Sequence, residues 1–330
     1  MVYHGYSTSQ GHAGCRKAIA ANLNKRSDTA YSLNDLFITC GAAASLCITF
    51  RALTASAEDE IIVLAPYFPE YKVFIEGQGA KMKLVPARND MKLNLGGIKE
   101  AVNKNTKALL INSPNNPSGV VYSKEEIKEL ADYLKKMQQE LGQTIYLISD
   151  EPYRELVYND EPVPFIPNYY DNTIICYSWS KSLSLPGERI GYVLVNDKCD
   201  DNQTVMAAVG GAARSLGYVC APTLFQLVIE KCIDVKPNLE VYKKNRDILY
   251  DALTEMGYNV AKPDGAFYLF IEAPNGDSKQ FSEKAKEHDV LVVPGTGFGT
   301  GTHIRLSYCV DTEKCEKALP VFEKLIKELK

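Results

Sequence analysis

The sequence predicts an α/β fold with a large domain, in which a mostly parallel sheet lies between helices, and a smaller α+β domain at the C-terminal end. Short apolar runs bounded by turn residues alternate with longer segments of helical period, which favours a parallel sheet covered by helices. The chain of 330 residues, 45% of them hydrophobic, exceeds what one core usually supports. Because the pattern changes near residue 236, we expect a large domain at 1–235 and a small domain at 236–330.

Five apolar runs predict strands of the large sheet, and these are "EIIVLAP", "KALLINSP", "TIYLISDE", "TIICYSWS" and "GYVLV". The segment 123–142 is typical of an amphipathic helix, since its apolar residues recur at spacings of three and four. Ser123 and Glu126 predict a capping box at its start. After residue 221 two long helical stretches, the strands "GAFYLFIEA", "VLVVPG" and "HIRLSYCV", and a terminal helix follow. We expect the long helix near residues 238–257 to join the two domains rigidly.

Composition excludes several classes of partner. The net charge is −4, and the 37 basic and 41 acidic residues are intermixed, so no basic block favours nucleic acid. No apolar run reaches the roughly 20 residues of a membrane helix. Nine cysteines occur without a CxxC pair, mostly in apolar segments, which indicates reduced thiols, no metal site and a cytoplasmic protein.

Polar residues cluster where three predicted strands end. In a doubly wound sheet the ligand crevice lies beyond the carboxyl ends of the strands. The residues at these ends supply an amide, a carboxylate, a phenol, two hydroxyls and an amine, and they are Asn116, Asp150, Tyr153, Ser178, Ser180 and Lys181. One shared site explains this convergence better than three unrelated strand ends.

Lys181 is the candidate nucleophile of this site. Its neighbours Trp179 and Leu183 predict a partly apolar wall, which would lower the pKa of the amine and expose its neutral form. A desolvated lysine near a carboxylate and hydroxyls suits Schiff-base chemistry.

Three segments together carry a resemblance to a known family. "NSPNNPSG", "SDEPY" and "SWSKSLSLPGERIGY" resemble, in order, spacing and strand context, the signatures of class I/II aminotransferases of fold type I. The resemblance extends over nearly the whole chain. It implies an enzyme that uses pyridoxal 5′-phosphate (PLP) to move an amino group from an L-amino acid to a 2-oxo acid.

The resemblance also implies roles for the strand-end residues. Lys181 matches the lysine that forms a Schiff base with the cofactor and then moves the substrate Cα proton. Asp150 matches the partner of the pyridinium nitrogen. Tyr153 and Asn116 match the residues that bind the phenolic oxygen, and Asn116 also matches a contact to the substrate carboxylate.

Further positions match the groups that hold the two ends of the ligands. Arg189, Ser178 and Ser180 resemble the phosphate-binding group, completed by backbone N–H groups of Ala42 and Ala43 in "TCGAAASL". This turn departs from the family's more polar version. Phe68 in "APYFPEY" matches the aromatic residue that stacks on the pyridine ring, and Arg305 in "HIRLSYC" matches the arginine that binds the substrate α-carboxylate.

Tyr6 resembles the tyrosine that reaches the phosphate in the neighbouring subunit, so we expect a homodimer. Family members usually carry an N-terminal arm before this tyrosine, and here Tyr6 stands close to the first residue. We expect either a truncated version or an arm that is dispensable. Whether the site closes over substrate depends on which of these two alternatives holds. Cofactor binding depends on residues that are all present in the sequence.

Alternative functions remain open at the level of sequence. Tyr177 and Lys181 spell the YxxxK of short-chain dehydrogenases, but the sequence lacks the glycine-rich nucleotide turn. A β-eliminating C–S lyase is the main alternative on the same fold, and a non-catalytic regulator is a remote one. Arg214 is a candidate for binding a second carboxylate of aspartate or glutamate, although a surface role is the simpler interpretation.

Overall fold

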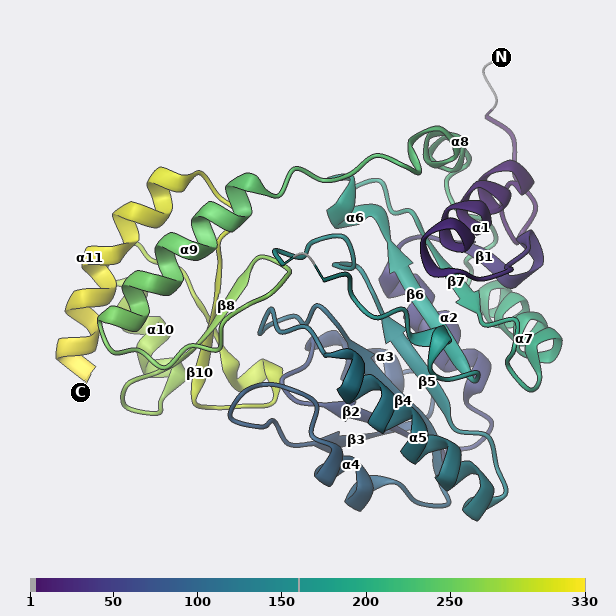
Figure 1. Ribbon diagram of the computed structural model, residues 1–330, viewed down its shortest axis with the longest axis horizontal. Coiled ribbons are helices and arrows are strands. Elements are labelled where there is room, and N and C mark those ends of the chain that lie inside the picture. The colour runs from purple at the N-terminus through teal and green to yellow at the C-terminus, as the bar shows by residue number, and fades with distance from the viewer. Residues whose placement is uncertain (1–3, 160, 330) are drawn as a thin grey trace.

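A seven-stranded sheet forms the centre of the larger part of the molecule (Figure 1). The computed structural model describes residues 4–159 and 161–329. The strand order is β1-β7-β6-β5-β4-β2-β3. The bounds are β1 (Leu36–Thr39), β2 (Glu60–Leu64), β3 (Lys81–Val85), β4 (Thr106–Asn112), β5 (Tyr146–Asp150), β6 (Thr173–Ser178) and β7 (Gly191–Val195).

Strand β7 runs antiparallel to both of its neighbours, and the remaining neighbouring pairs are parallel. The predicted mostly parallel sheet is therefore confirmed, and each of the five apolar runs contains a strand. Strand β3 has no counterpart among those runs, because it lies at the sheet edge and most of its residues remain partly or fully exposed. In the register of β4 and β5, Asn112 lies opposite Asp150, so both strands end at one edge.

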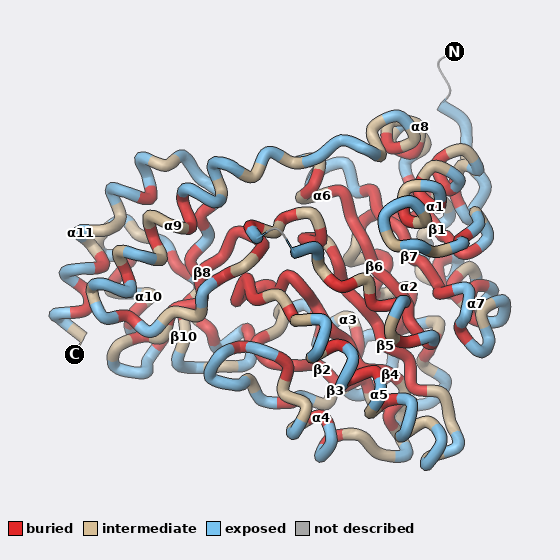
Figure 2. Tube along the Cα trace, viewed as in Figure 1, coloured by how far each residue is buried: buried red, intermediate tan, exposed pale blue. Residues whose placement is uncertain are grey.

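Helices cover both faces of this sheet, and the strands between them are buried (Figure 2). Helices α2 (Ala42–Leu53), α3 (Glu70–Glu76) and α7 (Asn202–Ser215) share one core with one face of the strands. The other face packs against α1 (Ala13–Ser27), α4 (Leu95–Ala101), α5 (Lys124–Leu141) and α8 (Thr223–Cys232). Short helical turns occur at η1 (Leu33–Asp35), η2 (Ile166–Asn168) and α6 (Trp179–Ser182).

A second sheet, of order β8-β10-β9, builds the smaller α+β part. Its antiparallel strands β8 (Tyr268–Glu272), β9 (Val293–Pro294) and β10 (His303–Ser307) pack with α9 (Glu240–Glu255), α10 (Ser278–Lys286) and α11 (Thr312–Leu329), and η3 (Gly295–Phe298) precedes β10. Tyr153, Leu156 and Tyr158 join this second core, so the chain before residue 235 contributes to it. The boundary between residues 235 and 236 stays a prediction.

The connection between the two parts differs from our expectation. Helix α8 ends at Cys232 and α9 begins only at Glu240, and the segment between them is not helical. Figure 1 shows this segment running as an extended connection. The helix predicted near residues 238–257 is present as α9, but the prediction that it joins the two parts rigidly is wrong. Pro237 lacks the N–H group that a helix continuous with α8 would need, and it disfavours helical geometry in the residue before it.

Membrane-spanning helices and metal-binding clusters are both absent from the described part of the chain. Within residues 4–159 and 161–329, no helix is both long enough and apolar enough to cross a membrane. The same part of the chain holds no group of three or more His, Cys, Asp or Glu side chains arranged to bind a metal ion.

The capping box of α5 gives a test of the fold. Glu126 N–H donates to Ser123 Oγ over 3.2 Å, and Ser123 N–H donates to the Glu126 carboxylate over 2.9 Å. Replacing Ser123 by Ala leaves one N–H group unpaired, and we expect the free energy of unfolding to fall by about 1 kcal/mol. Urea unfolding followed by circular dichroism measures the change. Ser123→Asp keeps a capping oxygen and serves as control, and equal midpoints for Ala and wild type would contradict the prediction.

Candidate active site

Asp150 occupies the end of the central strand β5 and is 4% exposed. The hydroxyl of Tyr71 donates to Oδ2 over 2.5 Å, whereas Oδ1 is buried with no hydrogen-bond partner in the part of the chain that the structure describes. Burial raises the pKa of Asp150 to about 7, against the opposing effect of the Tyr71 bond. A buried carboxylate oxygen without a donor is costly, so this atom suits a ligand N–H.

Tyr71 is a site residue that the sequence analysis missed. It is the second residue of helix α3 and lies within "APYFPEY", three residues after Phe68, so a signal was present in the same segment. The rings of Phe68 and Tyr71 meet edge to face, with centroids 5.5 Å apart. Phe68 therefore stands beside the donor that holds Asp150.

Lys181 lies on the short helix α6 and not at the end of a strand as predicted, since β6 ends at Ser178. Burial lowers the pKa of its amine, and the charges of Arg189 and Arg305 lower it further while Cys309 opposes them. The Nζ atom lies 5.5 Å from the ring centroid of Phe267.

The predicted apolar wall is therefore made by other residues. Trp179 and Leu183 pack in the core that also holds Tyr177 and Tyr192. Trp179 precedes Lys181 by two residues, and the turn of α6 carries its side chain into that core. Instead, the amine lies over the ring of Phe267, from the smaller part of the molecule.

Arg189, Ser180 and Ser178 form a connected group at one end of the site. Arg189 Nη1 donates to Ser180 Oγ over 3.3 Å, and the hydroxyls of Ser180 and Ser178 are 2.6 Å apart. A Cβ atom on Gly41 would fall on the Arg189 guanidinium, so the turn before α2 requires glycine there, with φ +89°.

Ala42 and Ala43 open α2 directly after this glycine. The first N–H groups of a helix have no partner within the helix, and they favour anions. The Arg189 guanidinium and the first N–H groups of α2 therefore create a region of positive potential, which suits a phosphate group.

Arg305 of strand β10 reaches across to the large sheet. Its Nη1 donates to Asn116 Oδ1 over 2.9 Å, and its guanidinium lies 4.7 Å from the ring centroid of Tyr268 and 4.9 Å from that of Phe298. The Nε atom is buried without a partner among the described residues. An arginine that lies over two aromatic rings and has an N–H group without a partner among the described residues is suited to bind a carboxylate.

Tyr153 hydrogen-bonds Tyr268, with 2.9 Å between the hydroxyl oxygens. Sequence reasoning missed Tyr268, Phe298 and Phe267, because they come from distant segments of the smaller part and carry no local motif. The structure thus brings together two groups of the predicted residues around one edge, Ser178, Ser180 and Arg189 on one side and Tyr153, Asn116 and Arg305 on the other.

Tyr6 and Arg214 lie apart from these contacts. Tyr6 is 87% exposed in the segment before α1, and Arg214 is an exposed residue in the last turn of α7. Neither position tests the predicted roles in a neighbouring site or in binding a second carboxylate.

The residues fit pyridoxal 5′-phosphate. The bare Oδ1 of Asp150 suits the protonated ring nitrogen, and the cradle of Arg189, the two serines and α2 suits the phosphate. The amine of Lys181, whose pKa burial lowers, would be the group that meets the aldehyde. Together these groups are suited to the ring nitrogen, the phosphate and the aldehyde of this one cofactor.

Comparison with known proteins decides the family. The model of the family described as "Aminotransferase class I and II" matches residues 2–322. The chain belongs to this family. An aminotransferase crystal structure from Eubacterium rectale is 53% identical with a TM-score of 0.97, over 99% of this chain and 82% of that one.

Two curated relatives have different named substrates. The probable aspartate aminotransferase of Methanocaldococcus jannaschii is 29% identical over 97% of this chain and 85% of that protein. The probable N-acetyl-LL-diaminopimelate aminotransferase of Bacillus subtilis is 33% identical over 96% of this chain and 80% of that protein. The protein is thus an enzyme of the aminotransferase class with the fold of that class, which overturns the dehydrogenase alternative. In agreement, the Tyr177 hydroxyl, which a short-chain dehydrogenase would use together with Lys181, hydrogen-bonds Glu155 and Ser182.

The raised pKa of Asp150 predicts a pH effect in the cofactor-free aminotransferase. The folded state holds the carboxyl proton more tightly than the unfolded chain, so this group lowers the free energy of unfolding as pH rises from 3.8 to about 7. Asp150→Asn removes the effect. Its stability relative to wild type should therefore increase across this window, by up to about 4 kcal/mol, and then level off.

Urea unfolding at several pH values measures this difference. The same change of charge at the exposed Glu129, Glu129→Gln, is the control, for which we expect no such slope. A difference between Asp150→Asn and wild type that stays constant with pH would show that Asp150 ionises normally.

Proposed function

We propose that this aminotransferase binds pyridoxal 5′-phosphate through Lys181 and moves an amino group from an L-amino acid to a 2-oxo acid in two half-reactions. The observation that carries the proposal is Oδ1 of Asp150 at the end of the central strand, which is buried and has no hydrogen-bond partner among the described residues. A ligand that donates a hydrogen bond to that atom would compensate it, and a cationic ring N–H would do so while keeping the carboxylate ionised. We expect ping-pong kinetics.

The chain's own residues supply binding and proton transfer. When bound, the cofactor supplies an electron sink for the pair left on the substrate Cα once its proton is removed. Asp150 would hold a proton on the ring nitrogen, and that pairing would favour the ionised carboxylate. Lys181, freed when substrate arrives, would move the proton at Cα, a task that the lowered pKa of its amine supports.

The remaining side chains would orient the two ligands. Arg189 with Ser178 and Ser180 would bind the phosphate, assisted by the backbone at Ala42 and Ala43. Because Asn116 Oδ1 accepts from Arg305, its amide nitrogen is the atom that can donate to the phenolic oxygen, alongside Tyr153. Phe68 would stack on the ring.

Arg305 would bind the substrate α-carboxylate through the N–H groups that Asn116 does not use. We propose aspartate as the first donor to test, because relatives are named for it. The B. subtilis relative of comparable identity is named for a larger substrate, so the panel should include donors with long side chains.

We further propose a cytoplasmic homodimer in which Tyr6 reaches the phosphate bound by the neighbouring subunit. The exposure of Tyr6 in the segment before α1 supports a contact with a second chain. The nine cysteines form no disulfide, which supports a reducing compartment.

Lys181→Ala tests the central role. Wild-type protein mixed with the cofactor should develop the visible absorbance of a lysine-bound carbonyl, and borohydride followed by peptide mass spectrometry should place the adduct on Lys181. Lys181→Ala should lose the adduct and about 10⁴-fold or more of kcat, the upper end of general-base contributions. An adduct on another lysine, or keto-acid-independent release of pyruvate and ammonia from cysteine, would overturn the proposal.

Arg305→Gln tests substrate binding. Losing a charge-assisted bond to carboxylate should reduce kcat/KM about 100-fold, equivalent to about 2.7 kcal/mol, while the cofactor absorbance stays. Arg214→Gln is the matched control, for which we expect unchanged values with alanine and aspartate. A loss confined to aspartate in Arg214→Gln would assign Arg214 to the second carboxylate after all.

A further inference from the structure

Tyr177 belongs to the YxxxK spacing that the transfer reaction leaves unexplained. Successive residues of β6 point to opposite faces, so Ser178 joins the phosphate-binding group while Tyr177 points to the other side of the sheet. Its side chain is 2% exposed, and its ring stacks on Tyr192 with centroids 5.0 Å apart. The hydroxyl therefore sits at a fixed place behind the active site.

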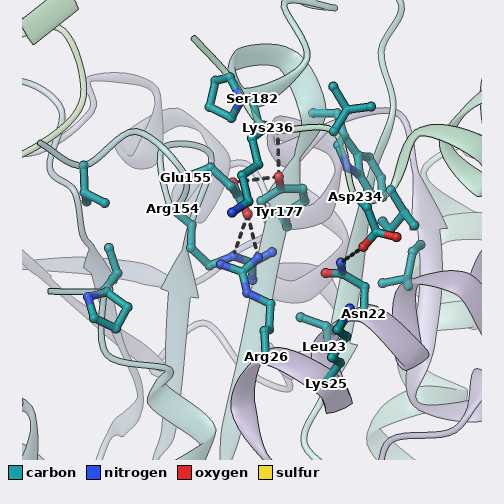
Figure 3. Close-up of a pocket in the computed structure, with 18 of the residues that line it drawn as sticks. Asn22, Leu23, Lys25, Arg26, Arg154, Glu155, Tyr177, Ser182, Asp234 and Lys236 are labelled. Carbon is teal, nitrogen blue, oxygen red and sulfur yellow. Dashed lines mark hydrogen bonds and ion pairs between the residues drawn. The ribbon is translucent and has the colours of Figure 1, made fainter. Parts of the chain in front are cut away.

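The Tyr177 hydroxyl joins two further groups (Figure 3). It donates to Glu155 Oε2 over 2.8 Å and lies 2.9 Å from Ser182 Oγ. Burial alone would raise the pKa of Glu155, but the charges of Arg154 and Arg26 outweigh it and hold the pKa below its usual value. Glu155 is therefore a pure acceptor, and Tyr177 has one proton to give, so Ser182 must donate to Tyr177.

Ser182 is the last residue of α6 and directly follows Lys181. In a helix, residues three apart share a face, which places Trp179 with Ser182. Both are buried, whereas Ser180 and Lys181 are half-buried. The centroids of Trp179 and Tyr177 lie 5.2 Å apart, so Tyr177 contacts the inner face of α6 through its ring and its hydroxyl.

Glu155 is itself held from two elements. Arg26 of α1 donates to its Oε1 over 2.9 Å, and Arg154 donates to the same oxygen over 3.2 Å. Arg154 also donates to Glu151 over 2.8 Å, and its guanidinium lies 4.3 Å from the ring centroid of Tyr177.

We call Glu151, Arg154, Glu155, Tyr177 and Ser182 the backing cluster. Glu151 follows Asp150 and Arg154 follows Tyr153, so the cluster ties the segment that holds those two residues to the helix that holds Lys181. Four of its members, all but Glu151, line a pocket of about 550 Å³ whose lining does not include Lys181 (Figure 3).

A four-residue helix has almost no stability of its own, so its orientation depends on its contacts. We propose that Tyr177 is a positioning residue. Its hydroxyl links Ser182 to Glu155, which Arg26 and Arg154 hold in place. This link fixes helix α6 so that the Lys181 amine stays partly desolvated. This inference rests on the proposed function of Lys181. The amine faces Phe267 and, by charge, Cys309, Arg189 and Arg305, and none of them belongs to the backing cluster.

Competitive labelling of the cofactor-free protein tests the proposal. Acetic anhydride reacts with neutral amines, so the pH dependence of Lys181 labelling, read by peptide mass spectrometry against exposed lysines such as Lys136, reports the pKa of Lys181. In Tyr177→Phe the helix loosens and the amine becomes more hydrated. We expect its labelling near neutral pH to fall about threefold to tenfold, corresponding to a pKa that is higher by half a unit to one unit.

Tyr170→Phe is the matched control. Tyr170 is also buried, and its hydroxyl donates to the carbonyl of Ile145 over 2.6 Å, away from α6. It should lose stability as Tyr177→Phe does but keep the labelling profile of wild type. Equal profiles for Tyr177→Phe and Tyr170→Phe would overturn the positioning role.

Ser182 variants give an independent route should Tyr177→Phe fold poorly. Ser182→Ala should reproduce the fall in labelling, and Ser182→Thr, which keeps a hydroxyl, should restore it. Adding Ser182→Ala to Tyr177→Phe should cause no further fall, because both remove the same bond. Additive effects would overturn the relay. A Lys181 that already labels like Lys136 in wild type would overturn the inference at its premise, whereas the absence of a borohydride-trapped adduct on Lys181 would refute the proposed function.

Discussion

A carboxylate buried at the end of the central strand constrains the whole site. Asp150 loses its hydration on folding, and within residues 4–159 and 161–329 its carboxylate receives only one hydrogen bond, from Tyr71. The raised pKa records that cost. The surrounding parallel strands bring their carboxyl ends to the same edge, so a ligand that compensates Asp150 is also within the region served by Lys181 and Arg189. The fold therefore leaves a buried acceptor atom on Asp150 that a ligand with a hydrogen-bond donor can satisfy.

Two sequence segments divide their residues between the front and the back of the site. In "DEPYRE", Asp150 and Tyr153 belong to the candidate site. On the other side, Arg154 bonds both Glu151 and Glu155, and Glu155 accepts from Tyr177. In "YSWSKS", Ser178, Ser180 and Lys181 face the ligand side, and Tyr177, Trp179 and Ser182 face the core. Charge buried behind the site is neutralised locally, since Arg154 lies between two carboxylates.

Local patterns were enough to predict the sheet, helix α5 and the position of Asp150 and Ser178 at the ends of two strands, because period and turn chemistry act over a few residues. They failed for α6, since four residues carry too little periodicity to distinguish a helix from the end of a strand. They also failed for Tyr71, Phe267 and Tyr268. Two of these come from segments more than eighty residues beyond Lys181, and only packing of the smaller part against the sheet brings them to it.

Arg305 connects the two parts of the molecule directly at the site. Its bond to Asn116 joins strand β10 to the loop after β4, 189 residues apart in sequence. A substrate carboxylate that takes the remaining N–H groups must approach beside that bond and against the rings of Tyr268 and Phe298. Substrate binding would therefore strengthen the contact between the two parts through one guanidinium. Because that guanidinium is already oriented by two rings, little side-chain entropy remains to be lost when the substrate arrives.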